Sequence, residues 1–154
     1  MEKSRILAFT DGVIAIVTTV LVLGLSTPLS ASWGSLAAVL PQIIVYAISF
    51  LVVAIYWNNH HHLFQIVNFV TGKNLWANNL FIFSLTLLPF AAGWVGNYLN
   101  HLAPEMTYGF VLLFADITYY LLVKSLEKSG SFDKSVVDFS SDSKKMTVSI
   151  SMNI

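Results

Sequence analysis

The sequence predicts an all-α bundle of four transmembrane helices, and three observations lead to this prediction. Among the 154 residues, 56% are hydrophobic and only 10% are charged, whereas about a quarter of the residues of a soluble domain are charged. The mean hydropathy is +0.71. Four apolar segments each contain the roughly 20 residues that cross a bilayer core, at about 5–25, 36–57, 75–95 and 105–123. Together they make one membrane domain over residues 1–125.

The first span, at 5–25, is apolar apart from Arg5 at its start and Asp11 inside it. A signal peptide is a poorer interpretation, because its apolar region is about 7–15 residues long and carries no acid. An ionisable group inside a bilayer is costly unless it has a partner. We therefore expect the neighbouring helices to supply partners for Asp11.

The second span, at 36–57, follows an uncharged loop at 26–35 that is short enough to make the first two spans antiparallel neighbours. Pro41 lies in the first turns of this span, where a missing N–H group is tolerated. The polar segment that follows, at 58–62, ends in His60, His61 and His62. Apolar residues continue beyond this segment, so we expect the helix to extend past the membrane edge.

The third span, at 75–95, begins after a turn at 71–74 and carries Asn78 and Asn79 early in its length. The fourth span, at 105–123, holds Asp116 a little past its middle. Residues 126–154 are rich in Ser, Asp and Lys, which predicts a poorly ordered polar tail. A pair of short strands within this tail is the alternative.

The positions of Lys and Arg predict the orientation of the bundle. These residues precede the first span, lie between the second and third, and follow the fourth, whereas the loops at 26–35 and 97–104 contain none. Because cytoplasmic loops carry the excess of Lys and Arg, both termini are predicted to be cytoplasmic. The polar residues of the first three spans then form one layer near the inner face, with Arg5, Asp11, the three histidines, Asn78 and Asn79.

Spacing divides the first span into two faces. One stripe recurs at intervals of four and three residues, which places its members on one side of a helix: Arg5, Phe9, Gly12, Ile16, Thr19 and Leu23. Asp11 lies about 140° from Ile16, since successive residues are about 100° apart. Ordinary helix packing is the simpler interpretation of the stripe, and the lining of a pore is the alternative.

The carboxylate of Asp11 has two possible uses. It can be structural, paired with Arg5 or bonded by Asn78, Asn79 or a histidine, or it can serve as a proton relay or an ion site. Asp116 has no obvious local partner, and we expect it to face another helix or a protomer contact. A water-filled path at Asp116 is the alternative.

Other classes of site find little support. Three consecutive histidines point about 100° apart on a helix and cannot all reach one metal ion, so a hydrogen bond from one or two of them to Asp11 or an asparagine in the polar layer is the better interpretation. Phosphate-binding loops, nucleophile triads and basic grooves for nucleic acid are absent. With no cysteine there is no thiolate site. We expect neither a cofactor nor an enzymatic activity.

Three segments of this sequence resemble one known family. Arg5-x-x-x-Phe9-Thr10-Asp11 resembles the R-x-x-x-F-S-D signature on the first helix of bacterial members of the endosomal and lysosomal potassium-channel family, with Thr10 in place of Ser. The other two segments are Tyr56-Trp57-x-x-His60-His61, and Leu75-Trp76-x-Asn78-x-Leu80 with Leu87-Leu88-Pro89-Phe90. The resemblance covers residues 3–125.

The resemblance implies a potassium-permeable cation channel in the bacterial plasma membrane, assembled as a homotetramer whose first helices line the pore. Apolar side chains of that helix would form the constriction. The family's pore isoleucine corresponds to Ile16, the next constriction position to Leu23 and a pore-facing threonine to Thr19, with Val20 beside them. The structural polar network of the motif would comprise Arg5, Phe9, Thr10, Asp11, His60, His61 and Asn78.

Bacterial members of this family have six spans, whereas this sequence shows four. Two other functions are therefore kept as alternatives. One is a proton-coupled carrier of ions or small solutes that uses Asp11, Asp116 and the histidines. The other is a non-conducting subunit of a membrane assembly. Potassium ions, the lipid bilayer and further copies of the chain are the expected partners of a channel.

Overall fold

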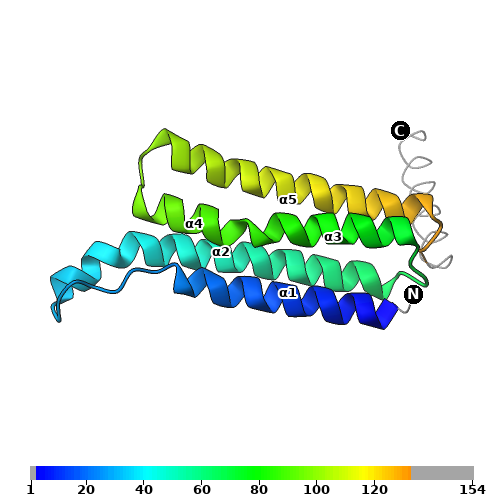
Figure 1. Ribbon diagram of the computed structural model, residues 1–154, viewed down its shortest axis with the longest axis horizontal. Helices are drawn as coiled ribbons and strands as arrows, with labels where there is room; N and C mark the ends of the chain where they lie inside the picture. The colour runs from blue at the N-terminus through cyan, green and yellow to red at the C-terminus, as the bar shows by residue number, and fades with distance from the viewer. Residues whose placement is uncertain (1–2, 133–154) are drawn as a thin grey trace, which may run out of the picture.

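The computed structural model describes residues 3–132, and it confirms the predicted helical bundle. Five helices follow one another along the chain: α1 (Lys3–Leu23), α2 (Trp33–Gln65), α3 (Gly72–Thr86), α4 (Leu88–Asn97) and α5 (Leu102–Lys128) (Figure 1). Four helical units are long and apolar enough to cross a membrane, namely α1, α2, α3 together with α4, and α5. Each corresponds to one of the four predicted spans.

Helix α2 is longer than a bilayer requires. Its 33 residues give a length of about 50 Å at 1.5 Å per residue. It begins after Ser32, whose hydroxyl oxygen accepts a hydrogen bond from the Ser35 N–H group at 3.2 Å, and Pro41 is accommodated within it. Its first turns project beyond α1 and α4 (Figure 1), while its last turns carry the three histidines, as expected for a helix that extends past the membrane edge.

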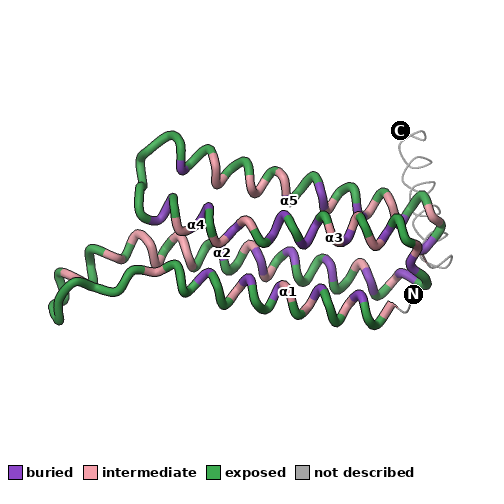
Figure 2. Tube along the Cα trace, viewed as in Figure 1, coloured by how far each residue is buried: buried purple, intermediate pink, exposed green. Residues whose placement is uncertain are grey.

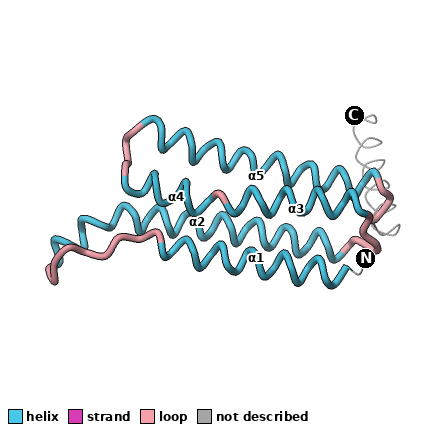
Figure 3. The backbone as a smooth tube through the Cα atoms, viewed as in Figure 1, coloured by secondary structure: helices cyan, strands magenta, loops and turns pink. Residues whose placement is uncertain are grey.

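The third span is two helices rather than one. It starts with a capping box in which the Thr71 side chain and the Asn74 side chain bond each other's backbone N–H groups. The span is interrupted between Thr86 and Leu88, as Figure 3 shows. Proline has no N–H group and its ring clashes with the carbonyl four residues earlier, so Pro89 breaks the helix at this point. It is accommodated in the first turn of α4, where no donor is needed.

The core is a narrow strip along the axis of the bundle. Helix α3 packs along α5, and α2 packs along α4 and α1. Each helix turns one stripe inward (Figure 2), and the buried residues of α1 are Ile6, Thr10, Ile14, Val17 and Leu21. Large apolar side chains cover the outer faces and are exposed in the isolated subunit. In a membrane these faces contact lipid or other helices.

Both ends of the described chain lie at the same end of the bundle (Figure 1). Gly130, with a φ of 66°, turns the chain after α5, and the Ser131 carbonyl accepts a hydrogen bond from the Asn68 N–H group at 2.8 Å. Residues 126–128, expected in the polar tail, belong to α5, and residues 129–132 return to the connection between α2 and α3. The remainder of the predicted tail lies outside the described residues.

The buried side chain of Asn74 links the start of α3 to the last turns of α5. Its amide oxygen accepts hydrogen bonds from the Thr71 N–H group at 2.9 Å and hydroxyl at 2.6 Å, and its amide nitrogen donates to the Ser125 hydroxyl at 3.0 Å. We expect Asn74→Ala to lower the free energy of unfolding by about 1–3 kcal/mol, because buried groups lose their partners. Reversible unfolding in detergent micelles measures this change.

Asn68→Ala is the matched control, because Asn68 is an exposed asparagine in the neighbouring connection. We expect it to change stability by about 0.5 kcal/mol or less. Equal effects of the two substitutions would contradict a structural role for Asn74.

Candidate functional site

Helix α1 presents two different faces, as its spacing predicts. The buried stripe packs against α2, α3 and α4. Every member of the predicted stripe is exposed on the opposite side: Arg5, Phe9, Gly12, Ile16, Thr19 and Leu23. Ile16 is 62% exposed and Leu23 is 80% exposed. In the isolated subunit, this stripe therefore has no packing partner among the described residues.

The predicted constriction residues all lie on this outward side. Val20, beside the stripe, is 41% exposed. The Thr19 hydroxyl donates its proton to the Ile16 carbonyl at 2.8 Å. Because the proton is used within the helix, the lone pairs of the Thr19 oxygen remain available on the exposed face. This oxygen can therefore accept a hydrogen bond from water or contact a cation.

Asp11 is bonded by a residue that the sequence did not single out for it. Its carboxylate accepts a hydrogen bond from Trp57 Nε1 at 2.9 Å. The expected partners Arg5, Asn78 and Asn79 do not contact it through any hydrogen bond or ion pair in the described chain. Arg5 lies six residues earlier, hence about 120° around the helix, which directs it to the exposed stripe while Asp11 faces α2.

A buried chain of hydrogen bonds joins the first three helices. His60 on α2 is 2.8 Å from the Asn78 amide oxygen through Nε2, and the Asn78 amide nitrogen donates to the Thr10 hydroxyl at 2.9 Å. All three side chains are fully buried. With the amide oriented in this way, His60 carries its proton on Nε2. Three of the predicted network residues, Thr10, His60 and Asn78, are thus in direct contact.

The three consecutive histidines occupy different environments. The His60 ring stacks on Phe64 with ring centroids 4.4 Å apart. His61 is exposed and stacks on Trp57, the partner of Asp11, with a centroid distance of 5.7 Å. His62 is exposed as well. Residues 3–132 contain no group of three potential metal ligands.

Asp116 also has a partner that the sequence analysis missed. Tyr56 donates its hydroxyl proton to the Asp116 carboxylate at 2.5 Å. Tyr56 and Trp57 are adjacent on α2, so their side chains point about 100° apart, one toward α5 and the other toward α1. The sequence did contain a signal for both contacts: two consecutive aromatic residues that carry hydrogen-bond donors lie at the same depth in the predicted membrane as the two acids.

Two further polar contacts were not foreseen. The Ser84 and Thr118 hydroxyls are 3.0 Å apart between α3 and α5, close to the break before α4. The Ser49 and Tyr108 hydroxyls are also 3.0 Å apart and join α2 to α5. Both serines are fully buried. These contacts attach α5 to the bundle, and no spacing rule pairs residues so far apart in the sequence.

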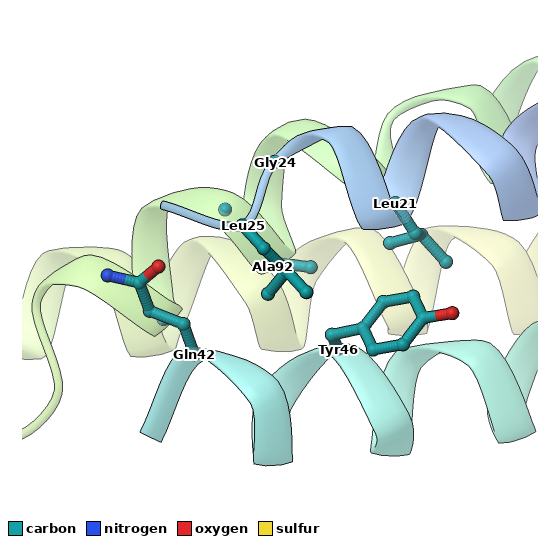
Figure 4. A pocket seen from close by; sticks show the side chains of 8 residues that line it. Leu21, Gly24, Leu25, Gln42, Tyr46 and Ala92 are labelled. Carbon is teal, nitrogen blue, oxygen red and sulfur yellow. The ribbon is translucent and has the colours of Figure 1, made fainter. Parts of the chain in front are cut away.

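At the opposite end of the bundle, the Gln42 side chain links α2 to the segment after α1 and to the end of α4. Its amide oxygen accepts from the Ser26 N–H group at 2.9 Å, and its amide nitrogen donates to the Asn97 side chain at 2.9 Å. The cavity next to it, lined by Leu21, Tyr46 and Ala92 among others (Figure 4), has a volume of about 10 Å³. Since a single water needs about this much space, the cavity is a packing gap rather than a ligand site.

The bond from Trp57 to Asp11 can be tested by a substitution that keeps the aromatic ring. Trp57→Phe removes the Nε1–H donor and leaves the half-buried Asp11 carboxylate, on the outer side of the contact between α1 and α2, without this partner. We expect a loss of about 1.5–3 kcal/mol in the free energy of unfolding, the range for hydrogen bonds to charged groups. Unfolding in detergent micelles measures it.

Trp76→Phe is the control, since Trp76 is 75% exposed. It should be close to neutral. A comparable loss in both variants would show that the change of ring, and not the bond to Asp11, is responsible.

Comparisons with known proteins place the chain in one family. Residues 5–89 match the sequence model of the endosomal/lysosomal potassium channel TMEM175 family. A potassium channel of Chryseobacterium sp. is 48% identical over 124 residues, covering 79% of this chain and 64% of the relative. A potassium channel of Streptomyces collinus is 31% identical over 138 residues, covering 84% of this chain and 66% of the relative. The chain thus spans about two thirds of the length of these relatives.

A solved structure shows the same fold. The crystal structure of a lysosomal potassium-selective channel TMEM175 homolog from Chamaesiphon minutus superposes with a TM-score of 0.75 and 27% identity, covering 94% of this chain and 80% of the homolog. The family match includes α1, α2, α3 and the first residues of α4, and so covers the bonds of Asp11 to Trp57 and of Asn78 to Thr10 and His60. This chain therefore belongs to the endosomal/lysosomal potassium channel TMEM175 family.

Proposed function

We propose that this chain is a subunit of a potassium-permeable cation channel in a bacterial plasma membrane, and that several copies assemble with their α1 helices around the pore. The outward-facing stripe of α1 is the observation that carries the proposal. It is regular, continuous over the helix and exposed from Arg5 to Leu23. Membership of the family, which includes the potassium channels of Chryseobacterium sp. and Streptomyces collinus described above, supports the same function.

The composition of the stripe suits a narrow pore. Copies of Ile16 and Leu23 brought around an axis form apolar rings, and a hydrophobic constriction gates by excluding water. Thr19 lies between the two rings and offers hydroxyl oxygens at the point where an ion would lose part of its hydration shell. Gly12, about one turn to the cytoplasmic side of Ile16 in the predicted orientation, leaves a wider space next to the first ring.

The polar contacts on the other side of α1 fix which face meets the axis. Thr10 is bonded to Asn78, and Asp11 is bonded to Trp57. These are positioning residues, because they prevent rotation of α1 and do not lie on the stripe. A homotetramer is the assembly that the family resemblance implies. Cytoplasmic termini are supported by the Lys and Arg positions and by the shared end at which the described chain begins and finishes.

A proton-coupled carrier receives less support from the geometry. It would require Asp11, Asp116 and the histidines to act along one path. Asp11 is bonded to Trp57 and Asp116 to Tyr56, so the two acids are held on different sides of α2. Potassium flux distinguishes the proposed channel from a non-conducting subunit of a membrane assembly. Purified protein of a non-conducting subunit would give no potassium flux in liposomes, whatever its stoichiometry in detergent.

Shortening the proposed constriction should change conduction directly. We expect Ile16→Ala to widen the neck, raise single-channel conductance and weaken the preference for K⁺ over Na⁺, as planar-bilayer recordings would measure. Val22→Ala is the matched control, because Val22 is an exposed branched residue about 120° from Ile16 on the same helix. Unchanged conductance and ion preference in Ile16→Ala would exclude Ile16 as the constriction.

The role of the Thr19 hydroxyl is tested by Thr19→Val, which keeps the shape of the side chain and removes its oxygen. We expect a several-fold lower potassium conductance with the pore still assembled, because the constriction loses its polar atoms. Thr18→Val provides the comparison. Thr18 makes an equivalent bond to the Ala15 carbonyl at 2.7 Å but lies off the stripe. Equal losses in both variants would argue against a pore-facing Thr19.

A further inference from the structure

The end of α1 at Leu23 is held less firmly than the middle of the helix. Leu23 is the last residue of α1 and is 80% exposed, and the last buried residue before it is Leu21. Ile16 lies in the middle of the same helix, between the buried Ile14 and Val17. The carbonyl groups in the last turn of a helix have no partner further along it. A contact from outside α1 is therefore needed to fix the place of Leu23, but not that of Ile16.

The Gln42 side chain on α2 supplies such a contact. Its amide oxygen accepts a hydrogen bond at 2.9 Å from the N–H group of Ser26, three residues after Leu23. Within residues 3–132, this is the only hydrogen bond that joins residues 24–29 to α2 or to a later element. In Figure 4, the Gln42 side chain points from α2 toward the segment in which α1 ends. We call the bond from Ser26 to Gln42 the α1 tether.

The orientation of the Gln42 amide follows from its neighbours. The Asn97 amide nitrogen donates to the Gly93 carbonyl within α4 at 2.7 Å, so Asn97 presents its amide oxygen to Gln42. The Gln42 nitrogen donates to this oxygen at 2.9 Å, which leaves the Gln42 oxygen for the Ser26 N–H group. A side-chain amide has the donor and the acceptor that this arrangement requires, whereas an aliphatic side chain has neither and a carboxylate has no donor.

The backbone beneath Gln42 is held in place as well. Gly96 is buried on α4, and a Cβ atom built on it would lie 3.4 Å from the Gln42 Cα atom. Small residues let the backbones of membrane helices approach closely. Helices α2 and α4 therefore form a fixed base from which Gln42 reaches the end of α1. All of these groups lie within the described bundle, so the α1 tether does not depend on what surrounds the bundle.

We propose that Gln42 is the positioning residue for the ring that Leu23 forms in the pore. By holding Ser26, its amide fixes the last turn of α1 and determines how far the Leu23 side chains extend toward the pore axis. The inference rests on the proposed function, because Leu23 forms a ring only where copies of α1 surround a pore. Gln42 itself lies on α2 and does not belong to the α1 stripe.

Spin labels test the α1 tether without a measurement of conduction. The chain has no cysteine, so Leu23→Cys and Ile16→Cys each accept one nitroxide per subunit, diluted with a diamagnetic analogue in lipid vesicles. We expect Gln42→Met to raise the ratio of mobile to immobile label at position 23 by about 2- to 12-fold, the factor that corresponds to one neutral hydrogen bond. The label at position 16 should not respond. Gln65→Met is the matched control, because Gln65 is an exposed glutamine at the other end of α2.

Two further variants separate the hydrogen bond from the size of the side chain. Gln42→Glu keeps an acceptor for the Ser26 N–H group, so the label at position 23 should regain most of its wild-type immobility. In planar bilayers, Gln42→Met should change the potassium conductance of the wild-type channel but cause no further change in Leu23→Ala, because the substitution acts through Leu23.

Three results would overturn the role of Gln42. The first is unchanged mobility of the label at position 23 in Gln42→Met, and the second is equal mobility in Gln42→Met and Gln42→Glu. The third is an equal change of conductance by Gln42→Met with and without the Leu23 side chain. Failure of the proposed function gives a different pattern, in which the wild-type chain shows no potassium flux in liposomes while the label at position 23 still responds to Gln42→Met. That pattern would overturn the ring of Leu23.

Discussion

The amide of Asn78 is the contact on which the arrangement of α1 depends. In a bilayer the helices gain little from burying apolar side chains against one another, because lipid tails are equally apolar. Polar groups, in contrast, lose water and must find partners within the protein. The Asn78 amide uses both of its ends in this way, accepting from His60 Nε2 and donating to the Thr10 hydroxyl. It thereby joins three helices and fixes the rotation of α1 about its own axis.

That rotation determines what the outer face of α1 presents. Thr19 is nine residues after Thr10, which at about 100° per residue places the two on opposite sides of the helix. With Thr10 held inward by Asn78, Thr19 is directed outward, and Ile16 and Leu23 lie within the same stripe. The hydrogen bond from Trp57 on α2 to Asp11 favours the same rotation of α1 about its axis. The Asn78 amide and the Asp11 carboxylate thus determine which residues α1 exposes, although neither group lies on the exposed stripe.

Helix α2 carries the hydrogen-bond donors for Asp11 and Asp116. Tyr56 and Trp57 are consecutive, so a single turn of α2 is linked to α5 on one side and to α1 on the other. Hydrogen bonds to charged groups contribute about 1.5–3 kcal/mol each, more than most individual contacts between helices in lipid. The length of α2 and its central place in the bundle are consistent with this role.

Much of this architecture could be predicted from the sequence, because length and spacing are local properties. The four spans follow from apolar length, and the two faces of α1 follow from intervals of three and four residues. The partner of Asp11 could not be derived in this way. Arg5 and Asn78 are at a suitable depth, but depth does not specify direction around a helix. The bond between Tyr56 and Asp116 joins residues 60 positions apart, and no local pattern encodes such a contact. The break before Pro89 was signalled by the proline itself, yet only the packing against α5 and α2 shows that the chain continues as a second helix.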